Sequence, residues 1–504
     1  MPIFGLRLSC IIALVSGAIF PLALAPLFWW PIQLLSIAGL AFAFPAASTT
    51  RQAFAIGWCY SFGQFATGVS WIYVSIHSFG GTPIWLAVPM VGIFAAFLGL
   101  LPAAWFALRQ YLTGNTLAWL TLPAFWIMHE WFRSWFFTGF PWLFAGEGHV
   151  DTWLSGWAPI IGSYGISFIV VLTVTMTLEA LRQRNPLFLL IFSLWPIGLA
   201  LQSIEWTKLE GTMTVAAVQG NVNQNDKWRR EEILPTIEKY QNASKPLLGT
   251  DLILWPETAI TLFLDQYRPH MKRFADEARD QGSTIITGIP YRHSSGTTLA
   301  GEFHNSVTAF GAGSGIYHKQ RLVPFGEYVP LEKLIRGWIP FFDLDMSSFL
   351  EGEANQPPLL VPIISDDGNE ELALIAPFIC YEIAYADLVA HNAKEADLLV
   401  TVSNDAWFGD SLGPKQHMAL VRMRALETQR YILRSTNTGI TALVDERGHF
   451  VERIPVNAEG ILTGVAQRRS GTTPYMLWGI WPTLGLAFFI AIVAIWQRRR
   501  LKKL

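Results

Sequence analysis

The stretch ALIAPFICYEIAYAD, residues 373–387, runs from a continuous apolar segment into a polar one and places Cys380 at the junction. A continuous apolar run is typical of a strand that is covered on both faces of a sheet. Reactive groups commonly lie where such a strand ends in a loop. The other two cysteines, Cys10 and Cys59, lie inside apolar segments. Cys380 is therefore a candidate nucleophile, although a single cysteine is more often a small buried hydrophobe.

Similar β-rich runs recur on both sides of this stretch, through residues 212–465. Helical patterns lie between them near 229–245, 266–281 and 415–433, the last with apolar residues at helical spacing as far as Ile432. Alternation of strands and helices favours a layered α/β domain. We therefore expect residues 206–470 to form a water-exposed α/β domain.

Apolar sequence dominates outside this domain. The chain of 504 residues is 52% hydrophobic and 15% charged, whereas soluble domains average roughly 25% charged residues. Because about 20 apolar residues span a bilayer, we predict a polytopic α-helical membrane domain over 1–205 with about seven transmembrane helices. A last transmembrane helix and a basic tail are expected in 471–504. The expected spans lie near 8–25, 28–46, 53–75, 84–108, 116–136, 157–181, 186–204 and 475–496.

Positive charge predicts the orientation of these spans. Arg51, Arg109, Arg182 and Arg184 fall in alternate loops, and RRRLKK follows the last span at 498–503. Because cytoplasmic loops are enriched in Lys and Arg, both termini are expected in the cytoplasm. The α/β domain would then lie on the opposite side, which in a bacterium is the periplasm. The basic tail is interpreted as a topology anchor, and a net charge of -2 gives no reason to expect nucleic-acid binding.

No metal, cofactor or oligomer is predicted. The chain has no Cys-x-x-Cys pair, and HEWFR at 129–133 has Arg133 where a zinc helix needs its second histidine. Nothing in the sequence argues for an oligomer, so we expect a monomer.

Two further polar residues end β-rich runs. Glu257 follows LILWP, and Lys319 lies in IYHKQRLVPFGEYVP. Taken singly, such a glutamate is usually a turn residue and such a lysine is usually solvated. Together with Cys380 they favour acyl transfer, because a carboxylate can take the thiol proton. An ammonium, helped by a backbone N–H such as that of Tyr381, can stabilise the resulting oxyanion.

Glu257 in LWPET, Lys319 in YHKQRLVPFGE and Cys380 in ICYE resemble the Glu-Lys-Cys triad of the nitrilase superfamily. SNDAWFG at 403–409 and the segment 416–439 fit the same superfamily, whose domains are α-β-β-α sandwiches. The chain is more narrowly similar to the apolipoprotein N-acyltransferase family. This similarity lies in KxxLVPFGEYVP at 319–330, in CYE at 380–382 and in the layout of apolar spans around the α/β domain.

That resemblance implies a ping-pong reaction in the bacterial inner membrane. Cys380 would take a fatty acyl chain from a phospholipid and pass it, through a thioester, to the α-amino group of the diacylglyceryl-cysteine of an apolipoprotein. This is the last step of bacterial lipoprotein maturation. The resemblance also implies supporting roles for Glu327, Tyr381 and Glu382 and substrate contact by Trp228.

A lid is suggested by the segment IRGWIPFFDLDMSSFL at 335–350. Trp338, Phe341 and Phe342 are too apolar for a free loop and are candidate substrate-binding residues. They would either dip into the lipid interface, where Trp is favoured, or pack against the core of the domain.

Two other functions share some of these features. A membrane-tethered amidase or nitrilase would use the same triad with water as the second nucleophile, but it would need fewer spans. A transporter with a periplasmic sensor domain is disfavoured, because the spans lack a row of charged residues.

Overall fold

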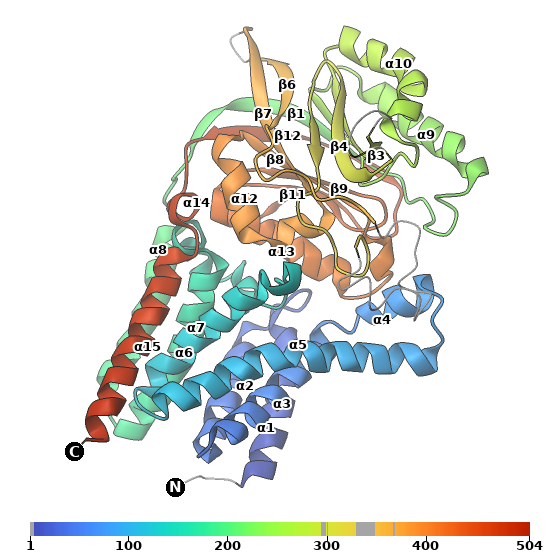
Figure 1. The fold of residues 1–504 in the computed structure, drawn as a ribbon. Helices are drawn as coiled ribbons and strands as arrows, with labels where there is room; N and C mark the ends of the chain where they lie inside the picture. The colour runs from blue at the N-terminus through green and yellow to red at the C-terminus, as the bar shows by residue number, and fades with distance from the viewer. Residues whose placement is uncertain (1–4, 294–298, 300, 329–347, 366–367, 504) are drawn as a thin grey trace. The chain divides into compact units, whose positions relative to one another are not determined.

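The computed structural model describes residues 5–293, 299, 301–328, 348–365 and 368–503 (Figure 1). Contacts divide the chain into two compact units, which are described separately. Unit 1 comprises residues 1–78, 82–204 and 477–504, and unit 2 comprises residues 79–81 and 205–476. Trp338, Phe341 and Phe342 lie outside the described residues, so the lid stays a prediction.

Unit 1 is helical. By length and composition, four helical stretches of the described chain are able to cross a membrane: Leu6–Ala23, Ile84–Thr113, Trp153–Gln183 and Trp481–Leu501. Shorter apolar helices cover Trp30–Ala43 and Pro186–Leu201. The count of eight spans stays a prediction. The helices are α1 Leu6–Ile19, α2 Trp30–Ala43, α3 Thr50–Gly68, α4 Ile72–Val74, α5 Ile84–Thr113, α6 Ala118–Arg133, α7 Ala158–Gln183, α8 Leu194–Leu201 and α15 Trp481–Leu501.

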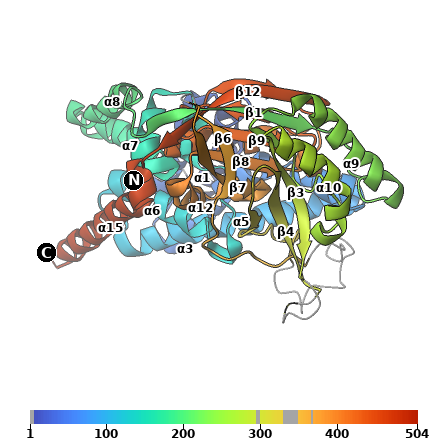
Figure 2. The ribbon, with the colours of Figure 1, turned by 90° about the horizontal axis from the view of Figure 1, so that it is seen from above.

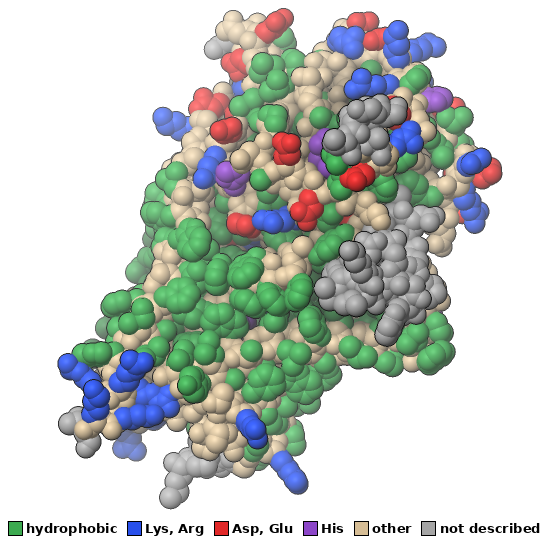
Figure 3. Space-filling model, viewed as in Figure 1, with side chains coloured by type: hydrophobic (Ala, Val, Ile, Leu, Met, Phe, Trp, Pro, Cys, Tyr) green, Lys and Arg blue, Asp and Glu red, His purple; other side chains and the backbone are tan. Residues whose placement is uncertain are grey.

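The visible surface of unit 1 suits a lipid environment. Hydrophobic side chains cover most of this face in Figure 3, and basic side chains gather near the end of α15, where Arg498, Arg499 and Arg500 lie. Large apolar side chains such as Trp85 and Ile93 on α5 are exposed. Exposed apolar surface of this extent is unfavourable in water and marks a membrane or partner surface.

Unit 2 contains two six-stranded sheets. The first has the order β12-β1-β2-β3-β4-β5, with β1, β2 and β3 parallel. The second has the order β11-β10-β9-β8-β7-β6, with β7, β8 and β9 parallel. The strands of the first sheet are β1 Lys208–Gln219, β2 Leu252–Leu254, β3 Thr284–Arg292, β4 Phe303–Gly311, β5 Ile316–His318 and β12 Gly460–Ser470. Those of the second are β6 Leu359–Ile364, β7 Glu370–Ile379, β8 Leu398–Ser403, β9 Ile432–Thr436, β10 Thr441–Val444 and β11 Phe450–Ile454.

The two sheets pack face to face around an apolar core. Val215 and Leu254 of the first sheet and Ile375 and Val400 of the second belong to one cluster and are at most 1% exposed. Helices α9 (Arg230–Ser244) and α10 (Leu264–Asp280) lie side by side on the outer face of the first sheet (Figures 1 and 2). Helices α12 (Ala386–Asn392) and α13 (Gly413–Thr428) lie beside the second sheet (Figure 1). The predicted α-β-β-α sandwich is confirmed.

One predicted helix is too long at its C-terminus. The pattern indicated helix through 433, but α13 ends at Thr428 and Ile432 begins β9. Gln429 adopts the left-handed conformation with φ 45°, which stops the helix. The apolar spacing predicted too long a helix because Ile432 is buried, but as part of the sheet and not of the helix.

Candidate active site

Glu257 follows β2 at the carboxyl end of the first sheet, and its carboxylate is held on both oxygens. Oε1 accepts a hydrogen bond from Asn305 Nδ2 at 2.8 Å, and Oε2 accepts one from the backbone N–H of Asn404 at 2.8 Å. Gly288 on β3 allows this turn, because a Cβ there would lie 2.7 Å from the Glu257 Cα. The side chain is only 10% exposed, so its orientation is fixed.

Lys319 follows β5 and lies between two carboxylates. Its Nζ is 2.8 Å from Glu327 Oε1 and 3.7 Å from Glu257 Oε1, and the side chain is 1% exposed. Burial lowers the pKa of Lys319, but Glu327, Glu257 and Cys380 outweigh burial and raise it above its usual value. The ammonium is therefore charged throughout the physiological range.

Cys380 follows β7 with a backbone φ of 54°, a conformation that a residue with a side chain rarely adopts. Such strain costs on the order of 1–3 kcal/mol and is typical of functional sites. Burial raises the pKa of its thiol, the Glu257 charge raises it further, and Lys319 and the Ser403 hydroxyl act in the opposite direction. The thiol therefore needs a proton acceptor in order to react.

Glu382 ties the loop of Lys319 to the turn of Cys380. Its Oε1 accepts hydrogen bonds from Tyr317 Oη and from the backbone N–H of Gln320, at 2.9 and 2.6 Å. Its Oε2 accepts one from the N–H of Ile379 at 2.7 Å. The side chain is fully buried, and burial raises its pKa to about 7 although Lys319 and these donors favour the charged form.

We expect Glu382 to make stability depend on pH. Its pKa is about 7 in the folded chain against an ordinary value of 4.5, so the folded state holds the proton more tightly. The free energy of unfolding should therefore fall as pH rises from about 4.5 to about 7. Thermal unfolding at pH 5, 6, 7 and 8 should show this fall in the wild type and a smaller one in Glu382→Gln.

A matched control is Glu459→Gln, which removes a carboxylate whose side chain is 64% exposed. Its melting temperatures should follow those of the wild type across the same range. Parallel curves for the wild type and Glu382→Gln would contradict this role of Glu382.

Glu327 and Tyr381, two of the other predicted residues, lie around this centre. Glu327 accepts from Lys319, from Asn305 and from the N–H of Val323. Tyr381 is buried beside Cys380, and its ring packs against Tyr385 with centroids 5.3 Å apart. Trp228 is 41% exposed, which leaves its ring accessible to a ligand.

Two residues that sequence reasoning missed contact Glu257. Asn305 on β4 donates from one nitrogen to both Glu257 and Glu327. Lys227 is 2% exposed, and its Nζ donates to the backbone carbonyl of Glu257 at 3.3 Å. Burial lowers the pKa of Lys227 to about 8, with the Glu257 charge acting in the opposite direction. The signal for Asn305 was a polar residue inside the run FHNSVTAFG, and the signal for Lys227 was its place beside Trp228.

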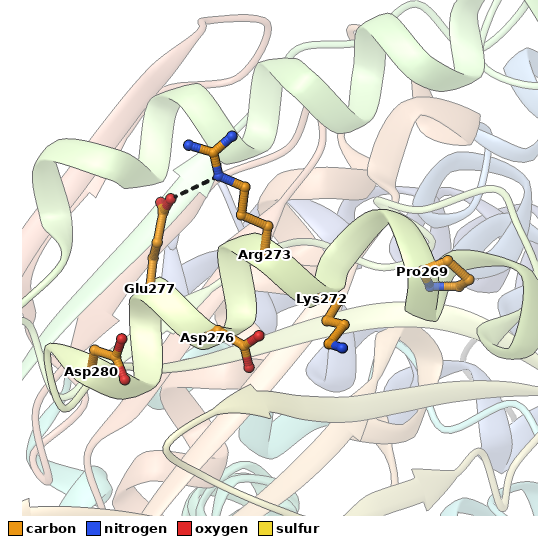
Figure 4. Close-up of a pocket in the computed structure, with 6 residues that line it drawn as sticks. All are labelled: Pro269, Lys272, Arg273, Asp276, Glu277 and Asp280. Carbon is orange, nitrogen blue, oxygen red and sulfur yellow. Dashed lines mark hydrogen bonds and ion pairs between the residues drawn. The ribbon is translucent and has the colours of Figure 1, made fainter.

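A surface depression elsewhere does not belong to this site. It is lined by residues of α10 alone, where Arg273 pairs with Glu277 at 3.2 Å (Figure 4). None of the predicted site residues lines it. Among the residues that the structure describes, no three His, Cys, Asp or Glu side chains are grouped to hold a metal ion. The expectation of a site without metal or cofactor stays a prediction.

The fold of unit 2 is that of the carbon-nitrogen hydrolases, whose family model matches residues 214–473. The model of the apolipoprotein N-acyltransferase N-terminal domain matches residues 16–176. Relatives about 40% identical over nearly the whole chain, described next, show that it belongs to the apolipoprotein N-acyltransferase family, as the sequence resemblance predicted.

Proteins named apolipoprotein N-acyltransferase are similar to this chain over nearly its full length. The protein of Azotobacter vinelandii is 40% identical over 511 residues, covering 97% of this chain and 95% of its own. That of Pseudomonas syringae is 41% identical over 488 residues, covering 94% and 93%. That of Coxiella burnetii is 35% identical over 499 residues, covering 96% and 99%.

Proposed function

We propose that this chain transfers a fatty acyl chain from a membrane phospholipid to the α-amino group of the diacylglyceryl-cysteine of an apolipoprotein. Cys380 carries the chain between the two substrates as a thioester. The observation that carries the proposal is the convergence of Glu257, Lys319 and Cys380, which follow three different strands of a carbon-nitrogen hydrolase fold. Membership of the apolipoprotein N-acyltransferase family supports these substrates.

In the first half-reaction Glu257 takes the proton of the Cys380 thiol. The sulfur attacks the ester carbonyl of the phospholipid, and Lys319 and the N–H of Tyr381 stabilise the oxyanion. The C–O bond then breaks, Glu257 returns the proton to the leaving alkoxide, and a lysophospholipid departs. Glu327 accepts a hydrogen bond from Lys319 and thereby keeps the ammonium in place.

In the second half-reaction the neutral α-amine attacks the thioester carbonyl. The C–N bond forms, the C–S bond breaks, and Glu257 carries one proton from nitrogen to the sulfur. Each buried methylene of an acyl chain is worth about 0.8 kcal/mol. Drawing both lipid substrates into water would therefore be expensive, which favours an enzyme held at the bilayer.

We also propose a membrane location and a topology for the chain. We assign residues 1–205 to a membrane domain of about seven helices, 206–470 to a periplasmic catalytic domain and 471–504 to a final span with a cytoplasmic basic tail. The chain would act as a monomer in the bacterial inner membrane. The apolar helices of unit 1 and the arginines at the end of α15 support this arrangement.

The test is intact-protein mass spectrometry of the purified full chain after mixing with dioleoyl phospholipid. We expect one added oleoyl group, mapped to Cys380 and absent from Cys380→Ala. A diacylglyceryl-cysteine peptide with a free α-amine should remove the group within the assay. Removal by water at the same rate would favour the amidase alternative, and an unmodified wild-type chain would refute the thioester.

A further inference from the structure

A buried histidine lies directly behind the strained turn of Cys380. His417 belongs to α13 and is 1% exposed. Its Nε2 lies 3.0 Å from the carbonyl oxygen of Cys380. Because a carbonyl oxygen only accepts, the hydrogen of this bond is on Nε2. His417 is thus a hydrogen-bond partner of the nucleophile's backbone, and it comes from a different element of the fold.

The opposite nitrogen of the same ring contacts a buried ion pair. His417 Nδ1 lies 3.1 Å from Arg434 Nη2 and 3.1 Å from Asp405 Oδ1. Arg434 Nη2 donates to Asp405 Oδ2 at 2.8 Å, and Ser403 Oγ donates to Asp405 Oδ1 at 2.6 Å. Burial and the Arg434 charge lower the pKa of His417, against the influence of Asp405. In the neutral ring the hydrogen is on Nε2, so Nδ1 accepts from Arg434 and makes no hydrogen bond to Asp405; Arg434 Nη2 lies between these two acceptors.

The packing around Asp405 holds the side chains of this network in place. A Cβ on Gly439 would lie 2.3 Å from Asp405 Oδ2, so only a glycine permits the carboxylate to reach Arg434 here. Asp405, Arg434 and His417 are each at most 1% exposed. The orientation of the imidazole is therefore set by neighbours that are themselves fixed.

The three residue types of a cysteine–histidine–aspartate catalytic set are also present here, as Cys380, His417 and Asp405. In such a set the histidine takes the proton of the thiol. Here the Nε2 hydrogen bond goes to the main chain of Cys380, and a hydrogen on Nε2 leaves that nitrogen unable to accept a proton. The carboxylate of Glu257 is the acceptor available to the sulfur, since it contributes directly to the electrostatic environment of the thiol.

We propose that His417 is a positioning residue for acyl transfer, which holds the backbone of Cys380 in its left-handed conformation through the Nε2–H bond to the Cys380 carbonyl. This inference rests on the proposed function of Cys380 as the acyl carrier. Without the donor, the carbonyl turns and the strained turn relaxes, so the sulfur is aimed at the ester for a smaller fraction of the time. Binding of phospholipid does not involve this bond and stays unchanged.

The experiment compares three variants of the full chain in detergent micelles with dioleoyl phosphatidylethanolamine and phosphatidylglycerol in equal amounts. A glutamine at 417 places an amide N–H near the position of Nε2, whereas asparagine and leucine do not. The rate of Cys380 acylation at saturating phospholipid should stay within about threefold of wild type in His417→Gln. It should fall about tenfold in His417→Asn and His417→Leu, with KM unchanged, as expected for one lost hydrogen bond.

Each outcome decides the role. Acylation by His417→Asn and His417→Leu at the wild-type rate would overturn the proposal. A His417→Gln variant as slow as His417→Leu would also overturn it, and a changed pH dependence of acylation in that variant would make His417 the base. Asn is polar and similar in size, so it keeps the comparison valid if Leu fails to fold. A wild-type chain that forms no thioester would instead refute the proposed function.

Discussion

Lys319→Met is expected to slow thioester formation about a thousandfold, by analogy with the loss of an oxyanion donor in a buried site. Lys319 carries the charge that lies between Glu257 and Glu327. Replacing it with an apolar side chain of similar length removes the group proposed to stabilise the oxyanion. Acylation of Cys380 followed by intact mass spectrometry measures the loss.

The same substitution should destabilise unit 2, because it leaves two carboxylates facing a buried site without their cation. Removing one partner of a buried pair typically costs about 3–5 kcal/mol. The double variant Lys319→Met with Glu327→Gln removes one of the two charges and should recover most of this loss in thermal unfolding. Its acylation should stay as slow as in the single variant.

These two measurements separate the structural role of Lys319 from its chemical role. If the double variant recovered acylation together with stability, the ammonium would act only by balancing charge. A Lys319→Met variant that acylates Cys380 at nearly the wild-type rate would remove Lys319 from the proposed chemistry altogether.

The sequence predicts those parts of the site that lie where a buried strand ends. Glu257, Lys319 and Cys380 are each a polar residue that follows a β-rich run, and the structure places all three at strand ends. The strands before Glu257 and Cys380 have parallel partners, and such strands with both faces covered have a clear apolar signal. Lys319 follows the short antiparallel strand β5. The apolar signal is local, so a single sequence is sufficient to read it.

The supporting contacts could not be predicted in this way. Asn305 meets Glu257 across 48 residues of chain, and His417 meets Cys380 across 37. Such pairs come together only when the strands and helices pack. The sequence does not distinguish His417 from the other polar residues of its helix. Its burial depends on the packing of elements that are distant in the chain.

The membrane half gave a weaker signal for a related reason. The span expected at 157–181 corresponds closely to α7, Ala158–Gln183, which lies in a helical stretch whose mean hydropathy reaches 1.8. By contrast, α3 includes Gln52, Ser61 and Gln64, of which Gln64 donates to the backbone carbonyl of Leu143 at 3.3 Å. Polar side chains that bond inside the unit are compatible with a membrane but weaken the hydropathy from which spans are predicted.

Glu257→Gln is expected to slow acyl transfer by about a thousandfold. The same substitution should make the thiol of Cys380 easier to ionise. Loss of a general base typically costs about a thousandfold in rate. The Glu257 charge raises the pKa of Cys380, so its removal leaves Lys319 to stabilise the thiolate. Alkylation of Cys380 by iodoacetamide at pH 8 should therefore quicken in the same variant in which thioester formation slows.

Opposite changes in these two rates are specific to a carboxylate that acts as the base. Glu257→Asp is the matched control, because it keeps the charge and withdraws the carboxylate by one methylene. It should leave alkylation near the wild-type rate and reduce acylation by less than Gln does. Acylation that falls less than tenfold in Glu257→Gln would mean that another group takes the thiol proton. Slower alkylation in that variant would mean that Glu257 stabilises the turn of Cys380 rather than accepting its proton.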